Sequence, residues 1–65
     1  MLGYALKLKS GKWATERKTG DAVWFINREI AEYVNWLKLN DAAEVVEVRL
    51  ERDCACYSGY DVREI

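Results

Sequence analysis

Two cysteines one residue apart, Cys54 and Cys56, are the clearest sign of chemistry in the sequence. Thiolates bind zinc, but a structural zinc site takes four ligands, and the chain has two cysteines and no histidine. Asp53 and Asp61 are poor additional ligands, so a full site requires a homodimer that shares both pairs. A disulfide is also disfavoured, because alternate strand residues lie about 6.6 Å apart, near the upper limit for that bond. We interpret the thiols as small core side chains, with a metal-bridged homodimer and a redox pair as alternatives.

The rest of the sequence offers little for catalysis. Without histidine, the chain lacks a side chain that titrates near neutral pH in its ordinary state. The carboxylate pairs Glu29 with Glu32 and Glu47 with Glu51 fit solvated faces of a helix and a strand. The glycines are scattered and form no phosphate-binding loop. We therefore expect a protein that is not an enzyme and that binds no cofactor.

The composition indicates one small folded domain over residues 1–65. The chain has no proline and no low-complexity run, which argues against disorder. Its longest apolar run, "AVWFI", is far shorter than the roughly 20 residues of a membrane span. The N-terminal stretch carries lysines and lacks the apolar core of a signal peptide. We expect a cytoplasmic protein without a membrane partner, in a compartment where thiols stay reduced.

A hairpin is predicted for residues 4–18, "YALKLKSGKWATERK", in which apolar and polar side chains alternate. A two-residue turn at Ser10-Gly11 would join the antiparallel strands. It sets three pairs of residues opposite one another on the apolar face: Leu8 with Trp13, Leu6 with Thr15, and Tyr4 with Arg17. Lys7, Lys9 and Lys12 then lie on the other, charged face.

A strand over residues 22–26 and a helix over about residues 28–39 are predicted next. Valine, tryptophan, phenylalanine and isoleucine favour the strand. Asn27 is a good N-cap, and Glu29 and Lys38 suit the first and last turns of the helix. The predicted inward side chains are Ile30, Val34 and Leu37, with Ala31 and Tyr33 flanking them. One long helix that starts after Asp21 is the alternative, because apolar residues recur at spacings of 3 and 4 from Val23 to Leu37.

The clearest strand is "AEVVEVRLERDCACY", residues 43–57. Val46, Val48 and Leu50 point to one face, and the same parity places Cys54 and Cys56 there. A three-residue loop over residues 57–59 then returns the tail as a last strand. The predicted pairs are Cys56 with Tyr60, Cys54 with Val62, and Arg52 with Glu64. The fold class is thus α+β: an antiparallel sheet of four to five strands, in the order ββ-β-α-ββ, with one helix packed on one face.

This layout resembles that of short orphan proteins encoded by phages and prophages. The resemblance rests on the opening "YALKLKSGKW", the strand-to-helix stretch "VWFINREIAEYV" and the strand "EVVEVRL", and it covers about residues 4–50. It implies non-enzymatic binding to a host or phage protein. Some proteins of this kind inhibit host defence or repair enzymes, anti-CRISPR proteins among them.

Protein binding is the function that the residues favour. Residues 1–20 carry a charge of +4 and residues 21–65 a charge of −5, which either marks a basic patch for an acidic partner or joins two halves during folding. One helix covers only one face of the sheet, so Trp24 is the first candidate for an exposed binding residue, with Trp36 at the helix edge. Lys7, Lys9 and Lys12 would steer an acidic partner.

Nucleic-acid binding is the alternative, because the same lysines lie close to Trp13, whose ring can stack on a base. The isoelectric point of about 5.3 argues against it, since nucleic-acid-binding domains commonly exceed 9. Both a monomer and a homodimer remain open.

Overall fold

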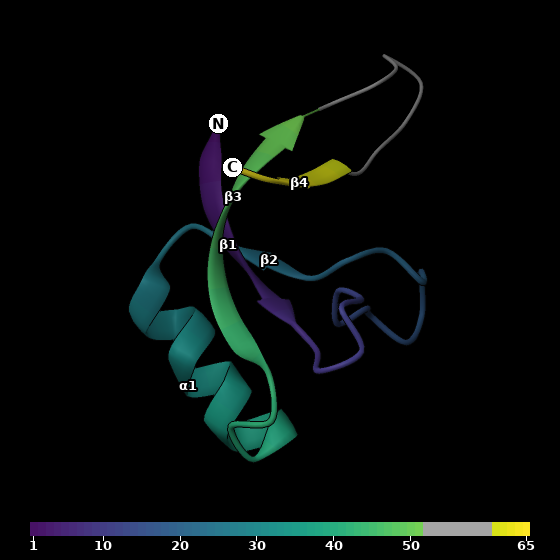
Figure 1. The fold of residues 1–65 in the computed structure, drawn as a ribbon, viewed down its shortest axis with the longest axis vertical. Helices are drawn as coiled ribbons and strands as arrows, with labels where there is room; N and C mark the ends of the chain where they lie inside the picture. Colours follow the sequence, from purple (N-terminus) through teal and green to yellow (C-terminus); the bar gives the residue numbers. More distant parts are fainter. Residues whose placement is uncertain (52–60) are drawn as a thin grey trace.

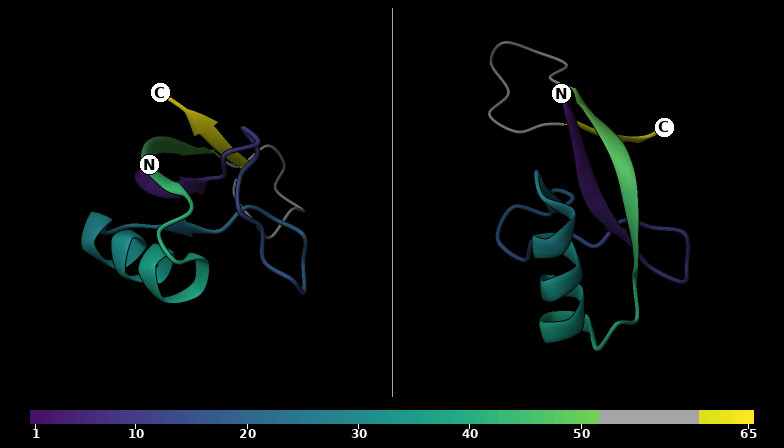
Figure 2. Two further views of the ribbon diagram at one scale, coloured as in Figure 1. Left: turned by 60° about the horizontal axis from the view of Figure 1, so that its bottom comes forward. Right: turned by 90° about the vertical axis from the view of Figure 1, so that its left-hand side faces the viewer.

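A four-stranded antiparallel sheet and one helix make up the fold (Figure 1). The computed structural model describes residues 1–51 and 61–65, so the predictions for Cys54, Cys56 and the loop at residues 57–59 lie outside the described residues. The elements are β1 (Leu2–Lys7), β2 (Trp24–Phe25), α1 (Arg28–Leu39), β3 (Glu44–Glu51) and β4 (Asp61–Glu64). The strand order is β2-β1-β3-β4, and α1 packs against one face of the first three strands (Figure 2). The predicted α+β class, with one helix on one face, is confirmed.

The turn after β1 differs from the predicted one. The Gly11 N–H donates to the Leu8 carbonyl at 2.9 Å, and the Leu8 N–H donates to the Lys12 carbonyl at 2.8 Å. These bonds close a three-residue loop in which Gly11, with φ of 87°, occupies the left-handed position that favours glycine. The loop moves the register by one residue, so Trp13 lies opposite Lys7. The predicted pairing of Trp13 with Leu8 is therefore wrong.

Residues 8–23, here called the arm, connect β1 to β2 (Figure 1). Within the arm, Thr15 pairs with Ala22 and not with Leu6. The edge of β1 that was predicted to pair with Thr15 and Arg17 is taken by β2, where Phe25 lies opposite Tyr4. Aromatic pairs across two strands contribute roughly 0.2–1 kcal/mol to a sheet, and both rings pack against the cluster on the helix side. The predicted second strand is thus reduced to single bridges.

The helix begins and ends where the sequence predicts. The Oδ1 of Asn27 accepts a hydrogen bond from the Glu29 N–H at 2.7 Å, which makes Asn27 the N-cap. Asn40 ends the helix in the left-handed conformation, with φ of 53°. The prediction of a strand before the helix is confirmed, although β2 has only two residues, and the alternative of one long helix is wrong.

The inner face of α1 was predicted only in part, since Val34 does pack against the core. Ala31 and Asn35 are its buried residues, with Val34 and Leu39 partly buried beside them. Ile30 and Leu37, which were predicted to point inward, are about half exposed. The small Ala31 lets the helix approach the sheet, and the side chain of Asn35 forms hydrogen bonds with the backbone of Ala43. The helix is therefore rotated away from the orientation that the spacing of its large apolar residues favours.

Both faces of the sheet carry a hydrophobic cluster. The cluster on the helix side has Leu6, Ala31 and Ala43 at its centre. The cluster on the opposite side has Ala5, Val48 and Leu50 at its centre, with Val46 and Val62 packed against it. The predicted common face of Val46, Val48 and Leu50 is confirmed.

The last strand pairs four residues away from its predicted register. Val62 lies opposite Leu50 and Glu64 lies opposite Val48, whereas Cys54 and Arg52 were predicted as their partners. A shift by an even number of residues leaves each side chain on its face, so alternation along the strand does not distinguish the two registers. The observed register places Val62 over the cluster around Leu50.

Candidate functional site

The outward side of α1 is apolar. Four of its large side chains are between 52% and 58% exposed: Ile30, Tyr33, Trp36 and Leu37. At 3.6 residues per turn they cover an arc of about 120°, centred opposite the buried Ala31 and Asn35. A surface helix ordinarily presents polar side chains in this direction. We call these four residues the apolar face of α1; Ile26, 68% exposed, precedes it along the chain.

Two aromatic rings occupy the centre and one side of this face. The ring centroids of Tyr33 and Trp36 lie 6.1 Å apart, with the planes inclined by 39°. Residues three apart on a helix are neighbours, so the helix holds the two rings side by side. Rigid aromatic side chains of this kind lose little conformational entropy on binding and are common hot-spot residues.

The apolar face is large for so small a chain. Aromatic side chains bury about 150–250 Å² when fully covered, so a half-exposed large side chain leaves on the order of 100 Å² in water. The four residues therefore expose on the order of 400 Å², within the range of about 300–600 Å² for the largest apolar patch of a monomer. A partner in a standard interface contributes about 800 Å². The face is thus large enough to form the apolar centre of an interface.

Lys7, a predicted binding cation, makes an ion pair within the chain. Its Nζ lies 2.7 Å from Glu64 Oε1 and 5.9 Å from the centroid of the Trp13 ring. The hydrogen bond and the charge of Glu64 raise the pKa of Lys7. β1 and β4 are separated by β3, so this contact indicates that the sheet curls away from α1. Lys7 joins two strands that are not adjacent.

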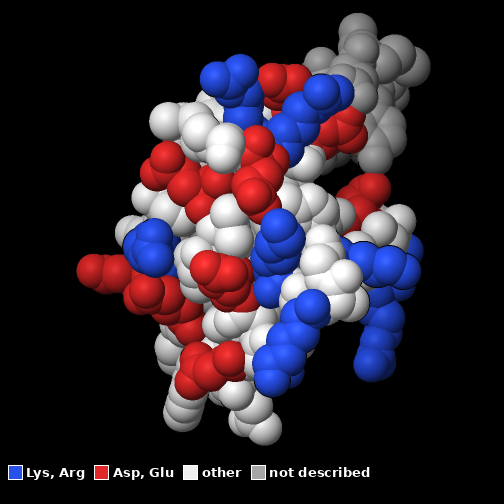
Figure 3. Space-filling model, in the orientation of Figure 1, with Lys and Arg blue, Asp and Glu red and all other residues white. Residues whose placement is uncertain are grey.

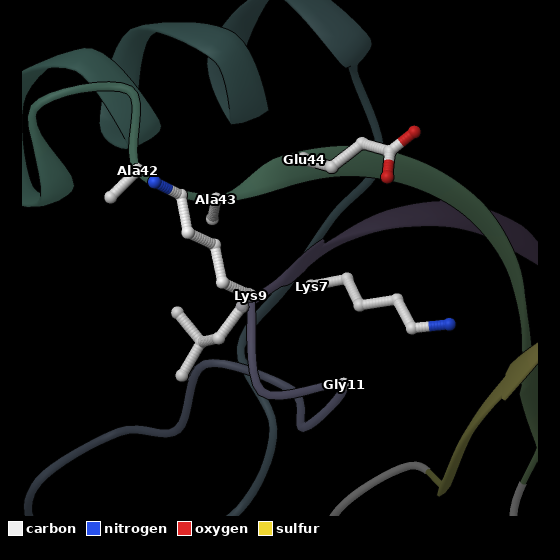
Figure 4. A pocket seen from close by; sticks show the side chains of 7 residues that line it. Lys7, Lys9, Gly11, Ala42, Ala43 and Glu44 are labelled. Carbon is white, nitrogen blue, oxygen red and sulfur yellow. The ribbon is translucent and has the colours of Figure 1, made fainter.

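Lys9 lines a hollow of about 430 Å³ between the loop after β1 and the loop after α1 (Figure 4). The side chains of Lys7 and Lys9 point in different directions there, Lys9 toward Ala42 and Lys7 away from it. The two lysines therefore do not form one cationic site.

Five cations make no ion pair within the described part of the chain. Four are on the arm and one is in the last turn of α1: Lys9, Lys12, Arg17, Lys18 and Lys38. In the lower half of Figure 3, Lys and Arg lie mostly to the right, over the arm, and Asp and Glu mostly to the left. The charge asymmetry of the sequence is thus also an asymmetry of the surface.

Trp24 lies on the face of the sheet away from α1, as the strand parity predicts, opposite Ala5. It is partly buried and packs against the cluster of Ala5, Val48 and Leu50. A side chain in this position contributes to the core of the sheet. Trp36, the other tryptophan predicted to bind, belongs to the apolar face of α1.

The apolar face was only partly anticipated. Tyr33 and Trp36 were expected at a helix edge, but Ile30 and Leu37 were assigned to the core. The signal that identifies the inner side is the spacing of Ala31 and Asn35, four residues apart and therefore on the same side of the helix.

Among residues 1–51 and 61–65, no group of three or more His, Cys, Asp or Glu is placed to hold a metal ion. The helix of the described chain is too short and too polar to span a membrane. Comparisons with protein-family models, with curated proteins and with solved structures find no match for the chain.

Proposed function

We propose that this chain is a small non-enzymatic protein-binding module that docks on a partner protein through the apolar face of α1. The observation that carries the proposal is the exposure of Ile30, Tyr33, Trp36 and Leu37 on the side of the helix opposite its buried residues. The resemblance to short phage and prophage proteins suggests a host or phage protein as the partner, and inhibition of a host defence system as a consequence of docking.

The area of the apolar face limits the affinity with which the chain can bind a partner. Covering on the order of 400 Å² of apolar surface is worth roughly 10 kcal/mol before the costs of association. Those costs are estimated at about 4–15 kcal/mol, so the apolar area alone supports only modest affinity. The paired rings of Tyr33 and Trp36 and a complementary polar rim must supply the rest.

Nucleic-acid binding through the arm is the second candidate, favoured by its unpaired cations Lys9, Lys12, Arg17 and Lys18. Against it, Trp13, the ring that would stack on a base, packs against the cluster around Val48. The arm offers charge without an exposed aromatic platform, which single-strand binding usually requires.

Affinity capture from a host lysate tests the proposal. The wild-type chain is compared with a Tyr33→Ser, Trp36→Ser double variant and with an Ile65→Ser control, which alters an equally exposed apolar residue away from α1. We expect a captured protein that the double variant loses and the control retains. Capture that survives the double variant, or that disappears on nuclease treatment, contradicts the proposal. Sedimentation of the chain alone identifies a second copy as the occupant if it shows a dimer that the double variant abolishes.

A further inference from the structure

A second hollow, of about 510 Å³, lies between α1 and the arm. Apolar side chains from three elements line it, among them Leu6, Ala14 and Val34. Pockets that take small ligands or single anchoring side chains are commonly about 300–1,000 Å³ and mainly apolar. The hollow therefore has room for a large apolar side chain of another molecule.

The hollow continues into the apolar face of α1. Val34, which lines the hollow, is four residues from Ile30 and three from Leu37 on the same helix. Residues at these spacings are neighbours on a helix surface. A segment that lies along the apolar face can thus place a side chain in the hollow without a gap between the two.

Two cations stand on opposite walls of this hollow. Arg17 comes from the arm and Lys38 from the last turn of α1, and neither makes an ion pair in the described part of the chain. Glu16 is the single carboxylate among the lining residues. Glu29, in the first turn of α1, lies within the arc of the apolar face, and Glu32, on its other flank, makes an ion pair with Arg28 at 3.4 Å. The apolar surface therefore has a basic border beside the hollow and a carboxylate, Glu29, at the N-terminal end of the helix.

We infer that the hollow and the apolar face of α1 together receive an acidic amphipathic segment of the partner protein. An apolar side chain of that segment enters the hollow, and its carboxylates lie against Arg17 and Lys38. The inference rests on the proposed function and specifies the chemistry of the partner.

The charges around the surface select this occupant over others. A nucleic acid or an anionic membrane presents negative charge throughout, and it would face Glu29 as well as the cations. In an antiparallel two-fold pair of α1 helices, like flanks meet, so Arg17 and Lys38 would face their own copies. A parallel pair would align the two helix dipoles. A separate polypeptide can carry carboxylates on one flank only.

Selection from a display library of random short peptides on the immobilised full chain tests the inference. We expect the selected peptides to share acidic residues beside one or two large apolar residues. A synthetic selected peptide is then titrated against Arg17→Glu and against the control Arg49→Glu, which makes the same charge change at the other end of the sheet. Arg17→Glu should weaken binding by about tenfold or more at low ionic strength, less at high salt, and the control should leave it nearly unchanged.

Ala14→Phe is a second variant, because it fills the hollow without removing a core side chain. We expect it to weaken peptide binding while the melting temperature shows that the chain still folds. A selected consensus without acidic residues, or equal effects of Arg17→Glu and Arg49→Glu, overturns the inference. So does displacement of the peptide by oligodeoxythymidine or by phosphatidylserine vesicles through the same Arg17. If the peptide still loses its binding in the Tyr33→Ser, Trp36→Ser variant, the proposal that a partner docks on α1 is retained. Only the inference that the partner segment is acidic is then wrong.

Discussion

Asn35 joins the middle of α1 to the start of β3 through two hydrogen bonds with the backbone of Ala43. Its Nδ2 donates to the Ala43 carbonyl at 2.6 Å, and the Ala43 N–H donates to its Oδ1 at 3.1 Å. Asn35 is only 6% exposed, and the bonds satisfy polar groups that water does not reach. Together with the buried Ala31 one turn earlier, this contact fixes the rotation of the helix. It is the reason that four large apolar residues face outward.

We predict that Asn35→Leu lowers the free energy of unfolding by about 2 kcal/mol or more, although it adds an apolar residue. The substitution leaves the N–H and the carbonyl of Ala43 buried without partners, and each such group costs about 1–3 kcal/mol. Urea denaturation measures the change. Glu32→Ala is the control on the same helix, since its exposed ion pair with Arg28 is worth well under 1 kcal/mol. Unchanged stability in Asn35→Leu would show that the two hydrogen bonds do not hold the helix in place.

We predict that Trp24 contributes to the stability of the fold, whereas Tyr33 and Trp36 contribute little to it and serve in docking. Trp24→Ala should lower the free energy of unfolding by about 2 kcal/mol or more, because the ring packs on the cluster of Ala5, Val48 and Leu50. Tyr33→Ser with Trp36→Ser should change it by less than about 1 kcal/mol, since half-exposed side chains contribute little to the fold. Urea denaturation of the two variants gives the comparison. The reverse order of effects would place the helix aromatics in the core and return Trp24 to the candidate interface.

The features predicted correctly are those that local chemistry determines. The ends of α1 follow from Asn27 and from residues that favour each end, and the faces of β3 follow from alternation at Val46, Val48 and Leu50. These signals lie within a few residues of one another in the sequence.

Register and helix rotation depend on contacts between distant parts of the chain. A Ser-Gly pair fits a two-residue turn or a three-residue loop, and the choice decides whether Trp13 shares a face with Leu8 or with Lys7. The alternation of apolar and polar residues does not determine the register of β4 either, because a shift by four residues leaves every side chain on the same face of the sheet. The apolar face of α1 was predicted only in part for a related reason: a buried asparagine is unusual, so Ile30 and Leu37 were placed inside.

Gly3 and Gly11 are predicted to respond differently to substitution. A Cβ at Gly3 would lie 2.8 Å from Leu50 Cδ1 and 2.8 Å from the Phe25 carbonyl oxygen, so Gly3→Ala must move backbone and should cost about 1–3 kcal/mol. Gly11 has open space around it, and only its φ of 87° disfavours other residues. Gly11→Asn should therefore be nearly neutral, and Gly11→Val clearly destabilising. Thermal unfolding of the three variants is the measurement; tolerance of Gly11→Val would contradict the three-residue loop.

The ion pair of Lys7 with Glu64 predicts how stability changes at alkaline pH. The hydrogen bond to Glu64, its charge and the charge of Glu44 raise the pKa of Lys7 in the folded chain. A lysine whose folded pKa is raised stabilises the fold fully below its unfolded pKa, about 10.4, and this contribution is lost as the pH rises through the folded pKa.

We therefore expect the wild type to lose more stability than Lys7→Met when the pH is raised from about 9 to beyond 11. Other lysines and tyrosines titrate in the same range, so the difference between the two chains isolates Lys7. Lys9→Met is the control, because Lys9 makes no ion pair within the described residues, and its alkaline profile should follow the wild type. Urea denaturation at a series of pH values gives the three profiles. If the Lys7→Met profile runs parallel to that of the wild type, the contact between β1 and β4 contributes nothing to stability, and Lys7 is available to an acidic partner after all.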